Sequence, residues 1–335
     1  KVDLSRFTDT TRHLTNSGIP TQGIAFYHQS TLDLLQGLSC SVGLRYDYEH
    51  ARCDFSKVQQ PLNGNGETKS LEQFNRSLHF GQFTPRFSMQ YLSSHNQLFY
   101  ASVSKGYKAG GFNVSFLNND DYLYSPEYNW NYEIGTKLSF LNNRLSADLS
   151  LFYIDWRNQQ ITNTIPTVGN VIRNAGRSRN KGIEASFQAR PTKSWVMYMN
   201  YGYTDARFVH YQKEECGILK DYGGNYLPMV PRHTFSLTTG YSFYDICSWI
   251  DRLTLNAGVS VTGPIYWYED NQAKQSPYAL VNLRISINKG CFTWEAWSKN
   301  LTNTDYLSYY FVTSKAYAQK GKPITLGTSV SNQTI

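Results

Sequence analysis

A two-residue alternation of apolar and polar side chains, repeated in long runs, is the feature that most constrains this chain. In LSCSVGLRYDYEH (38–50), even positions carry Leu, Cys, Val, Leu and two Tyr, and odd positions through 49 carry Ser, Gly, Arg, Asp and Glu. LTLNAGVSVTG (253–263) alternates in the same way. Because successive side chains of a strand point to opposite faces, each run predicts a strand with one apolar and one polar face. A half-buried strand of a soluble sheet alternates too, so length and connections must distinguish the two classes.

The alternating runs are numerous and long. Many span 11–15 residues, whereas strands of soluble sheets usually have about five or six. Thirteen runs are predicted, at residues 22–34, 37–50, 76–92, 97–108, 127–141, 144–158, 171–190, 195–208, 231–244, 252–264, 278–288, 291–304 and 323–335.

The connections between the runs alternate between short turns and long segments. Short turns are expected at LLQG, SSHN, LNNR, PTKS and NKG, with a slightly longer one at YDICSWID. Long polar and aromatic segments are expected at 51–75, 109–126, 159–170, 209–230, 265–277 and 305–322. Short turns at one end and long loops at the other are typical of outer-membrane barrels. The fold class predicted is therefore all-β, a transmembrane antiparallel β-barrel.

Composition supports this class and argues against others. Only 17% of residues are charged and 15% are aromatic, and we find no run near 18 apolar residues that would predict a transmembrane helix. The net charge of +7 is scattered rather than gathered into a stripe, so no nucleic-acid partner is expected.

Charged residues within the runs mostly share the polar parity. Arg or Lys facing lipid at mid-bilayer costs about 2–4 kcal/mol, falling toward zero at the interface. The residues at polar parity are Arg45, Glu133, Lys137, Asp148, Glu184 and Arg284. Lys105 is the exception, and we expect its amine to reach the headgroups from a strand end. Aromatic girdles are predicted near the run ends at Tyr46, Tyr48, Tyr128, Trp130, Tyr153 and Trp156.

No enzyme, cofactor or metal motif is evident. NGNGET (63–68) lacks the Lys-Ser/Thr of a phosphate loop, and no GxSxG occurs. The seven histidines form no HxxxH pair, and the five cysteines have no metal spacing. Cys53 and Cys216 fall in expected loops, which leaves a disulfide open.

Several segments together carry a family resemblance. They are YASVSKGYKAGGFN (100–113), SPEYNWNYEIGTKLSFLNNRLSADLSLFYIDWRNQQI (125–161), RNAGRSRNKGIEASFQARP (173–191), YLPMVPRHTFSLTTGY (226–241), PIYWYED (264–270) and KNLTNTDY (299–306). In this order, over residues 76–330, the chain resembles the C-terminal barrel of TonB-dependent outer-membrane receptors. The segments 106–113 and 126–137 are most similar to the iron-siderophore branch.

The resemblance implies a 22-stranded barrel around an N-terminal plug, of which these residues would supply strands 10 to 22. It implies energy-coupled uptake of an iron chelate, outer-membrane lipid as surroundings, the TonB-ExbB-ExbD system as partner, and a C-terminus toward the periplasm. The sequence shows no plug, TonB box or signal peptide, so residues 1–335 are expected to be the C-terminal portion of a receptor. By themselves they are expected not to form a stable barrel, because two strand edges would be unpaired.

The resemblance also suggests which residues contact ligand and which face the pore. A ferric siderophore is often anionic with a large organic shell, which suits aromatic faces and cations. Candidate ligand-binding residues are Lys108, Phe112, Asn113, Phe116, Tyr122, Tyr124, Tyr266, Trp267, Tyr268, Tyr309, Tyr310 and Phe311. The aromatic members could instead only anchor an interfacial girdle. Candidate lumen- or plug-facing residues are Arg45, Glu133, Lys137, Arg173, Arg177, Arg179 and Arg284.

Alternative functions stay open at this level. Receptors for cobalamin, haem or glycans would share the wall and differ in loops and plug. A passive porin would show steady conductance, and a soluble all-β binding protein would bury its apolar face against another sheet.

Overall fold

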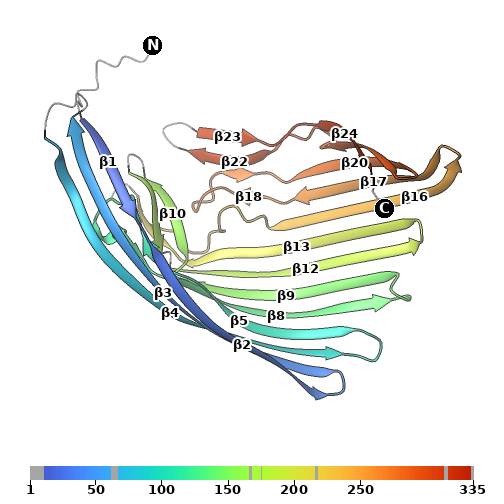
Figure 1. Ribbon diagram of the computed structural model, residues 1–335, viewed down its shortest axis with the longest axis horizontal. Helices are drawn as coiled ribbons and strands as arrows, with labels where there is room; N and C mark the ends of the chain where they lie inside the picture. Colours follow the sequence, from blue (N-terminus) through green and yellow to red (C-terminus); the bar gives the residue numbers. More distant parts are fainter. Residues whose placement is uncertain are drawn as a thin grey trace, which may run out of the picture.

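The fold is that of a computed structural model, which describes residues 11–61, 67–165, 168–174, 176–215, 218–312 and 316–332. Figure 1 shows an open, curved wall of long strands. The strands are β1 (Thr11–Gly18), β2 (Thr21–Leu35), β3 (Leu38–Pro61), β4 (Lys69–Leu92), β5 (Leu98–Lys108), β6 (Gly111–Phe112), β7 (Leu123–Tyr124), β8 (Glu127–Phe140), β9 (Leu145–Arg157), β10 (Gln160–Ile165), β11 (Gly169–Asn174), β12 (Arg177–Thr192), β13 (Trp195–His210), β14 (Gln212–Glu215), β15 (Ile218–Asp221), β16 (His233–Cys247), β17 (Ile250–Thr262), β18 (Ile265–Tyr266), β19 (Lys274–Gln275), β20 (Tyr278–Lys289), β21 (Phe292–Lys299), β22 (Leu307–Val312), β23 (Ala316–Lys320) and β24 (Thr325–Asn332).

The wall is one antiparallel meander. Its strands follow the order β1-β3-β4-β5-β8-β9-β12-β13-β16-β17-β20-β21-β24, with β2 pairing beside β1 on the same edge of β3. The wall is therefore thirteen strands wide, which confirms the predicted all-β antiparallel class. The remaining strands form two-stranded sheets within the long connections.

Several predicted boundaries were wrong. Segment 51–75, expected as a loop, is mostly strand, because β3 and β4 pair from Leu38↔Tyr91 out to Gln59↔Lys69. The expected run 171–190 divides into β11, which pairs with β10, and the wall strand β12. Both errors have one cause: the alternation of apolar and polar residues marks paired strands, and it continues into hairpins that extend beyond the predicted strand ends.

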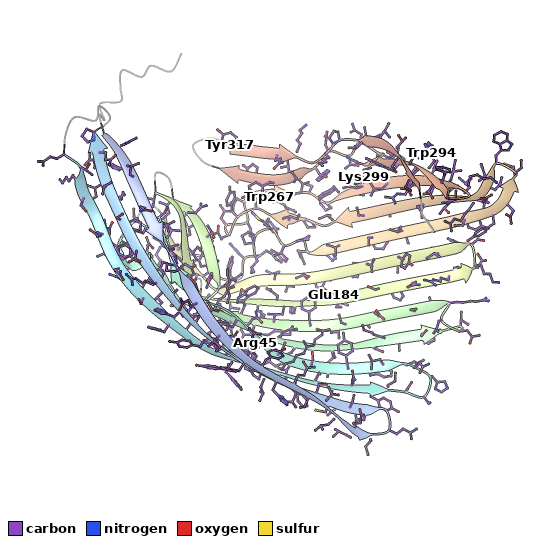
Figure 2. All side chains as sticks on the ribbon, in the orientation of Figure 1. Arg45, Glu184, Trp267, Trp294, Lys299 and Tyr317 are labelled. Atoms are coloured by element: carbon purple, nitrogen blue, oxygen red, sulfur yellow. The ribbon has the colours of Figure 1, made fainter. Side chains whose placement is uncertain are left out.

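The register separates an apolar face from a polar face across the wall. Ile134 on β8 lies opposite Leu151 on β9, which lies opposite Ile183 on β12. Their exposed fractions are 55%, 42% and 39%, far above those of a soluble core. On the other face Lys137 pairs with Asp148. Figure 2 shows side chains on both faces of the wall.

The predicted polar parity of the charges is confirmed by this register. Glu184 lies opposite Ser150 on β9, and Arg284 lies opposite Asn256 on β17. Trp156 differs from expectation: it pairs with Ser178 on the polar face, so it does not belong to an apolar-face girdle.

The long connections fold over the polar face at one end of the wall. Ala206 and Phe208 on β13 pack there with Tyr211, Tyr222 and Leu227 from the following connection. A second cluster joins Ala51, Cys53, Phe55 and Phe112. We call this end the loop end and the opposite end the turn end. Among the described residues, no helix is long and apolar enough to cross a membrane.

The position of Lys105 at apolar parity is explained by a split in the wall, where β4 and β5 separate. The β4–β5 ladder ends at Arg86↔Ser104, while β5 continues its pairing with β8 to Lys108↔Glu127. The Lys105 Nζ donates to Gln82 Oε1 at 3.0 Å and lies 5.4 Å from the centre of the Tyr128 ring. The amine is therefore held by the protein at the split, and the expected reach to headgroups is corrected.

The face assignment predicts opposite effects for neighbouring substitutions on β9. Leu151→Arg in the full-length protein should lower the free energy of unfolding in lipid vesicles by about 2–4 kcal/mol, because it places a cation on the apolar face. Ser150→Arg, on the polar face, is the matched control and should change it by less than about 1 kcal/mol. Urea unfolding monitored by Trp fluorescence measures both, and equal losses would contradict the assignment.

The open edges make a second prediction. Among the described residues, β24 pairs only with β21, and β1 and β2 pair only with β3. Since lipid cannot satisfy the remaining backbone groups, residues 1–335 refolded alone in detergent should give no heat-modifiable monomer on gel electrophoresis. A compact monomer that shifts on boiling would refute this.

Candidate functional site

The tip of β5 and the following glycines are packed too closely for side chains. A Cβ on Gly110 would lie 2.8 Å from Cε1 of Phe80, and one on Gly111 would lie 2.5 Å from the Tyr124 hydroxyl oxygen. The segment 109–113 therefore turns beneath the loop layer, where only glycine fits. Lys108, at the last position of β5, remains exposed.

Phe112 enters an aromatic cluster at the loop end. We call it the Phe55 cluster, with members Phe55, Phe74, Phe112, Phe116 and Tyr122. Ring centroids lie 4.8 Å apart for Phe55–Phe74, 4.7 Å for Phe74–Tyr122 and 4.4 Å for Phe116–Tyr122. Phe112 and Tyr122 are each 6% exposed. These rings hold the loop layer to the long β3–β4 hairpin.

Asn113 joins two loops that are far apart in sequence. Its Nδ2 donates to the carbonyl oxygens of Asp121 and Ile172 at 2.7 and 2.8 Å, and its Oδ1 accepts from the Ile172 N–H at 2.8 Å. The Asn113 side chain is 4% exposed, and both its amide nitrogen and its amide oxygen are hydrogen-bonded within the protein. Ligand contact by Asn113, Phe112 or Tyr122 stays a prediction that this burial does not favour.

Arg173 lies in the β10–β11 hairpin rather than on the wall. Its guanidinium donates to both Asp121 carboxylate oxygens, at 2.6 and 2.8 Å. Asp121 also accepts from the Leu117 N–H at 3.2 Å. The hydrogen bond from Arg173 holds the pKa of the Asp121 carboxyl below its usual value. Arg173 thus forms an ion pair between loops, and its lumen- or plug-facing role stays a prediction.

A second aromatic cluster lies at the loop end of the later strands. We call it the Trp267 cluster, made of Trp267, Tyr268, Tyr309 and Tyr310. Trp267 lies 6.3 Å from Tyr309 and 6.5 Å from Tyr310, and Tyr268 lies 6.2 Å from Tyr310, between ring centroids. Trp267 is 5% exposed and Tyr309 is 42% exposed. Figure 2 places Trp267 and Tyr317 at this end and Trp294 at the other. The side chain of Phe311 lies outside the described residues.

Tyr266, the neighbour of Trp267, has different surroundings. Its ring stacks on Tyr226 with centroids 5.4 Å apart and planes 7° apart. Arg207 pairs with Tyr226 in an isolated bridge and places its guanidinium 3.9 Å from that ring centre. Because directly paired residues share a face, Tyr226 lies on the same face as Arg207.

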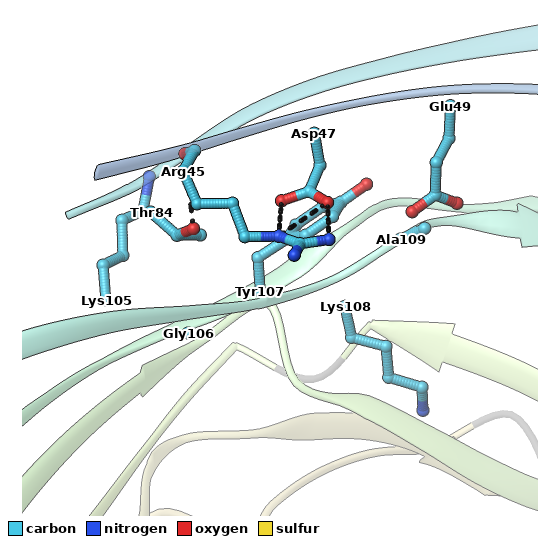
Figure 3. A pocket seen from close by; sticks show the side chains of 9 residues that line it. All are labelled: Arg45, Asp47, Glu49, Thr84, Lys105, Gly106, Tyr107, Lys108 and Ala109. Carbon is cyan, nitrogen blue, oxygen red and sulfur yellow. Dashed lines mark hydrogen bonds and ion pairs between the residues drawn. The ribbon is translucent and has the colours of Figure 1, made fainter. Parts of the chain in front are cut away.

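A polar pocket of about 380 Å³ lies at the split between β4 and β5. Arg45 Nε donates to both Asp47 carboxylate oxygens at 2.9 and 2.8 Å, and Glu49 and Lys108 also line the pocket, as Figure 3 shows. Arg45 thus neutralises a neighbour on its own strand, and charged groups of both signs remain around a solvent-open space.

Arg45, Glu133, Lys137 and Arg284 lie on the polar face, as expected for pore-facing residues. Glu133 accepts a hydrogen bond from the Tyr100 hydroxyl at 2.6 Å, and Arg284 lies 3.8 Å from Glu295.

The expectation for Arg177 and Arg179 is corrected by the register. Arg177 lies opposite Arg157, and Arg179 lies opposite Asp155, two residues beyond the Lys181↔Tyr153 pair on the same face as Ile183 and Leu151. Both arginines therefore share the apolar face of the wall, beyond its last apolar residues.

The cysteines and other possible metal ligands form no metal-binding group of three or more side chains in the part of the chain that the structure describes. Cys53 lies in β3 at 0% exposure rather than in a loop, and Cys216 falls outside the described residues. Across the described ranges, no group of three or more His, Cys, Asp or Glu side chains could hold a metal ion.

Sequence reasoning missed Phe55, Phe74, Asp121, Tyr226 and Arg207. The first two were assigned to a polar loop, although the odd-numbered apolar residues 51, 53 and 55 continue a period of two. Asp121 and Tyr226 contact residues of other loops, far away in the sequence. No sequence pattern within a single segment predicts such contacts.

Comparison with known proteins gives one family. A family model described as "TonB dependent receptor-like, beta-barrel" matches residues 3–303. The pesticin receptor of Yersinia pestis is 24% identical over 332 residues, covering 95% of this chain and 45% of the receptor. The probable TonB-dependent siderophore receptor PiuA of Acinetobacter baumannii is 25% identical over 238 residues, covering 66% of this chain and 29% of the receptor. The chain thus spans less than half the length of these relatives.

Solved structures show the same fold. The ferric yersiniabactin uptake receptor FyuA from Yersinia pestis superposes with a TM-score of 0.77 at 20% identity, over 95% of this chain and 46% of that one. The siderophore receptor PiuA from Acinetobacter baumannii gives 0.73 at 20% identity, over 93% and 42%.

The Asp121–Arg173 pair predicts a local, pH-dependent stability. Arg173→Gln should raise amide exchange in segment 113–122 of the full-length protein, because buried Asp121 loses charge-assisted bonds worth about 1–3 kcal/mol. Hydrogen exchange with mass spectrometry measures this. Lys193→Gln, in an exposed turn at the other end of the wall, is the control.

The sign of the pH effect follows from linkage. The folded pKa of Asp121 lies below its unfolded value of about 3.9. Its stabilisation is therefore fully present above about pH 4 and is lost as the pH falls through the folded pKa. Protection of 113–122 should fall in that window in the unmodified protein, and a similar fall in Arg173→Gln would refute the pair as its cause.

Proposed function

Because this chain belongs to the TonB-dependent receptor-like β-barrel family, we propose that it forms the C-terminal portion of an outer-membrane receptor for a ferric siderophore or similar iron chelate. The thirteen wall strands would be strands 10 to 22 of a 22-stranded barrel, with short turns and C-terminus toward the periplasm. Its partners would be the chelate outside and the TonB-ExbB-ExbD system, reached through a plug and TonB box in the same receptor.

The observation that carries the proposal is the aromatic layer at the loop end. Aromatic faces bind the flat organic arms of a chelate, and cations attract its negative charge. Two exposed side chains at the loop end are the best ligand contacts. They are Tyr309, 42% exposed in the Trp267 cluster, and Lys108, a cation that lines the polar pocket. Buried Phe112, Asn113 and Tyr122 would instead fix the shape of the loops.

The wall would provide the route inward. Lys137 opposite Asp148 and Arg284 near Glu295 give the polar face charges of both signs. Such a surface stays hydrated and holds no single charged ligand tightly. In this account the loops select the chelate, and movement of a plug against the polar face, driven by TonB, opens the path.

The names of the relatives favour iron chelates over the other cargoes. The matched proteins include siderophore and ferrichrome receptors. Each name describes the cargo of that relative, and the extension to this chain is our proposal. Receptors for cobalamin, haem or a glycan, and a passive porin, remain the alternatives to be tested.

Uptake of radioactive iron chelates by cells under iron limitation tests the proposal. Cells that lack the full-length protein should lose uptake of at least one catecholate, hydroxamate or phenolate chelate, and loss of TonB should abolish it too. Tyr309→Ala combined with Tyr310→Ala should raise the half-saturating concentration about tenfold or more, equivalent to about 1.4 kcal/mol of binding.

Tyr244→Ala, at the turn end of β16 and 53% exposed, is the matched control and should leave uptake unchanged. Uptake that persists without TonB would indicate a passive pore. Uptake of cobalamin or haem with no iron chelate transported would replace the proposed cargo.

A further inference from the structure

Two histidines from neighbouring strands face each other in the part of the β3–β4 hairpin that continues beyond β5. His50 on β3 pairs directly with His79 on β4. Their imidazole rings stack, with centroids 4.5 Å apart and planes 13° apart. The two residues are far apart in the sequence, so no spacing of histidines within one segment reveals them. We call them the His50–His79 pair.

The backbone hydrogen bonds bring these two side chains close together. The Arg52 N–H donates to the Pro20 carbonyl oxygen at 3.0 Å, so Arg52 directs its backbone groups away from β4. Residues two apart on a strand direct their N–H and C=O groups the same way, so His50 does the same. His50 and His79 therefore form a non-hydrogen-bonded pair, in which Cα atoms lie about 4.5 Å apart and side chains are closest.

The pair lies on the outer face of the hairpin and reaches solvent. On the opposite face, Cys53 and Phe55 are 0% and 3% exposed beneath the loop layer. Successive side chains of a strand alternate in direction, so His50 points away from that layer. His79 is exposed, and His50 is half-buried. An ion in solution can therefore reach both imidazoles without passing through the pore.

A hydrogen bond to Tyr48 holds the ring of His79. The Tyr48 hydroxyl oxygen lies 2.9 Å from Nδ1 of His79. When Nδ1–H donates to this oxygen, Nε2 keeps the lone pair that binds a metal ion. Histidines that bind metals almost always have their second ring nitrogen held in this way. The His50 ring has no hydrogen-bond partner among the described residues, so it can turn toward an ion.

The charged groups that follow on this face balance each other. Arg52, two residues beyond His50, donates to the Asp54 carboxylate at 3.1 Å. Asn75 on β4 also donates to Asp54. The positive charge nearest to the pair along β3 is therefore matched by a carboxylate, and a cation can approach the two imidazoles.

Two neighbouring neutral imidazoles can chelate a divalent transition metal. Imidazole suits Cu²⁺, Ni²⁺ and Zn²⁺, and Cu²⁺ binds most tightly to a given set of ligands. A metal–nitrogen bond is about 2.0–2.1 Å long, so two nitrogens on one ion lie about 3 Å apart. Rings with centroids 4.5 Å apart reach this separation by rotation about their Cβ–Cγ bonds. Water completes the coordination, because the pair supplies two protein ligands.

We propose that the His50–His79 pair binds a divalent transition-metal ion, with Cu²⁺ bound most tightly, on the outer face of the β3–β4 hairpin. The pair is separate from the residues proposed to contact the iron chelate. The proposal rests on the geometry of one hairpin and does not depend on the cargo of the receptor.

The bound ion joins two strands where the hairpin has lost a neighbour. The β4–β5 ladder ends at Arg86↔Ser104, so the part of β4 that carries His79 has no support from β5. Phe55 and Phe74, which stack on each other in the Phe55 cluster, pair across the same two strands nearer the hairpin tip. The ion therefore stabilises both the hairpin and the loops that pack on it.

Titration of the full-length protein with Cu²⁺ tests the proposal. The protein is studied in detergent and carries no polyhistidine tag. Electron paramagnetic resonance of the Cu²⁺ complex should show two equatorial imidazole nitrogens. His50→Gln and His79→Gln should each weaken binding about tenfold or more, because a single imidazole loses the advantage of chelation. Gln keeps these positions polar, and heat-modifiable mobility on gel electrophoresis verifies that both variants are folded.

Two further variants separate metal binding from a structural effect. His95→Gln changes a single exposed histidine in the turn between β4 and β5, and it should leave the Cu²⁺ affinity unchanged. Tyr48→Phe should weaken binding about tenfold and retain the two-nitrogen spectrum, because Tyr48 positions His79 and does not bind the ion.

Hydrogen exchange provides a second readout. Zn²⁺ should slow amide exchange in segment 69–84 of the unmodified protein, because the ion joins β3 to β4, and it should have no such effect in His79→Gln. Two outcomes would overturn the proposal. One is a Cu²⁺ spectrum of the unmodified protein without a pair of imidazole nitrogens, and the other is an unchanged Cu²⁺ affinity in both histidine variants.

Discussion

The hydrogen bonding of the backbone is the constraint on which the rest of this structure depends. Hydrocarbon offers no partner to an N–H or C=O group, so a strand can cross it only between two paired neighbours. The meander from β3 to β21 meets this condition through continuous antiparallel ladders. With the backbone satisfied by the sheet, side chains are free to alternate between lipid and pore, and the two-residue sequence pattern follows.

Aromatic residues serve different purposes on the two faces. On the apolar face, the Tyr132↔Tyr153 pair lies between the apolar residues of the wall and the charged residues at the loop end. On the polar face, the Phe55 cluster fastens loops to a hairpin that rises beyond the wall. Exposed rings, such as Tyr309, are the ones that we propose to contact a ligand. A high aromatic content alone therefore does not locate a binding site, because burial decides which rings can reach it.

The wall was predictable from sequence because its determinant is local. Parity alone placed Arg45, Glu133, Lys137 and Arg284 on the polar face. Parity failed at the loop end, where Arg177 and Arg179 lie on the apolar face of the wall beyond its last apolar residues. At that end of the wall, a polar side chain does not indicate a residue that faces the pore. The loop contacts were not predictable, since Asn113 binds Ile172 across 59 residues. No pattern within either segment encodes such a contact.

Spin-label scanning along β12 in the full-length protein tests the two-faced wall most directly. Single labels at positions 179 through 187 would be read for access to oxygen, which partitions into lipid, and to a water-soluble nickel complex. The account predicts lipid access at 183, 185 and 187, polar surroundings at 182, 184 and 186, and headgroup-level access at 179 and 181. Loss of the alternation, or lipid exposure at the even positions, would contradict it.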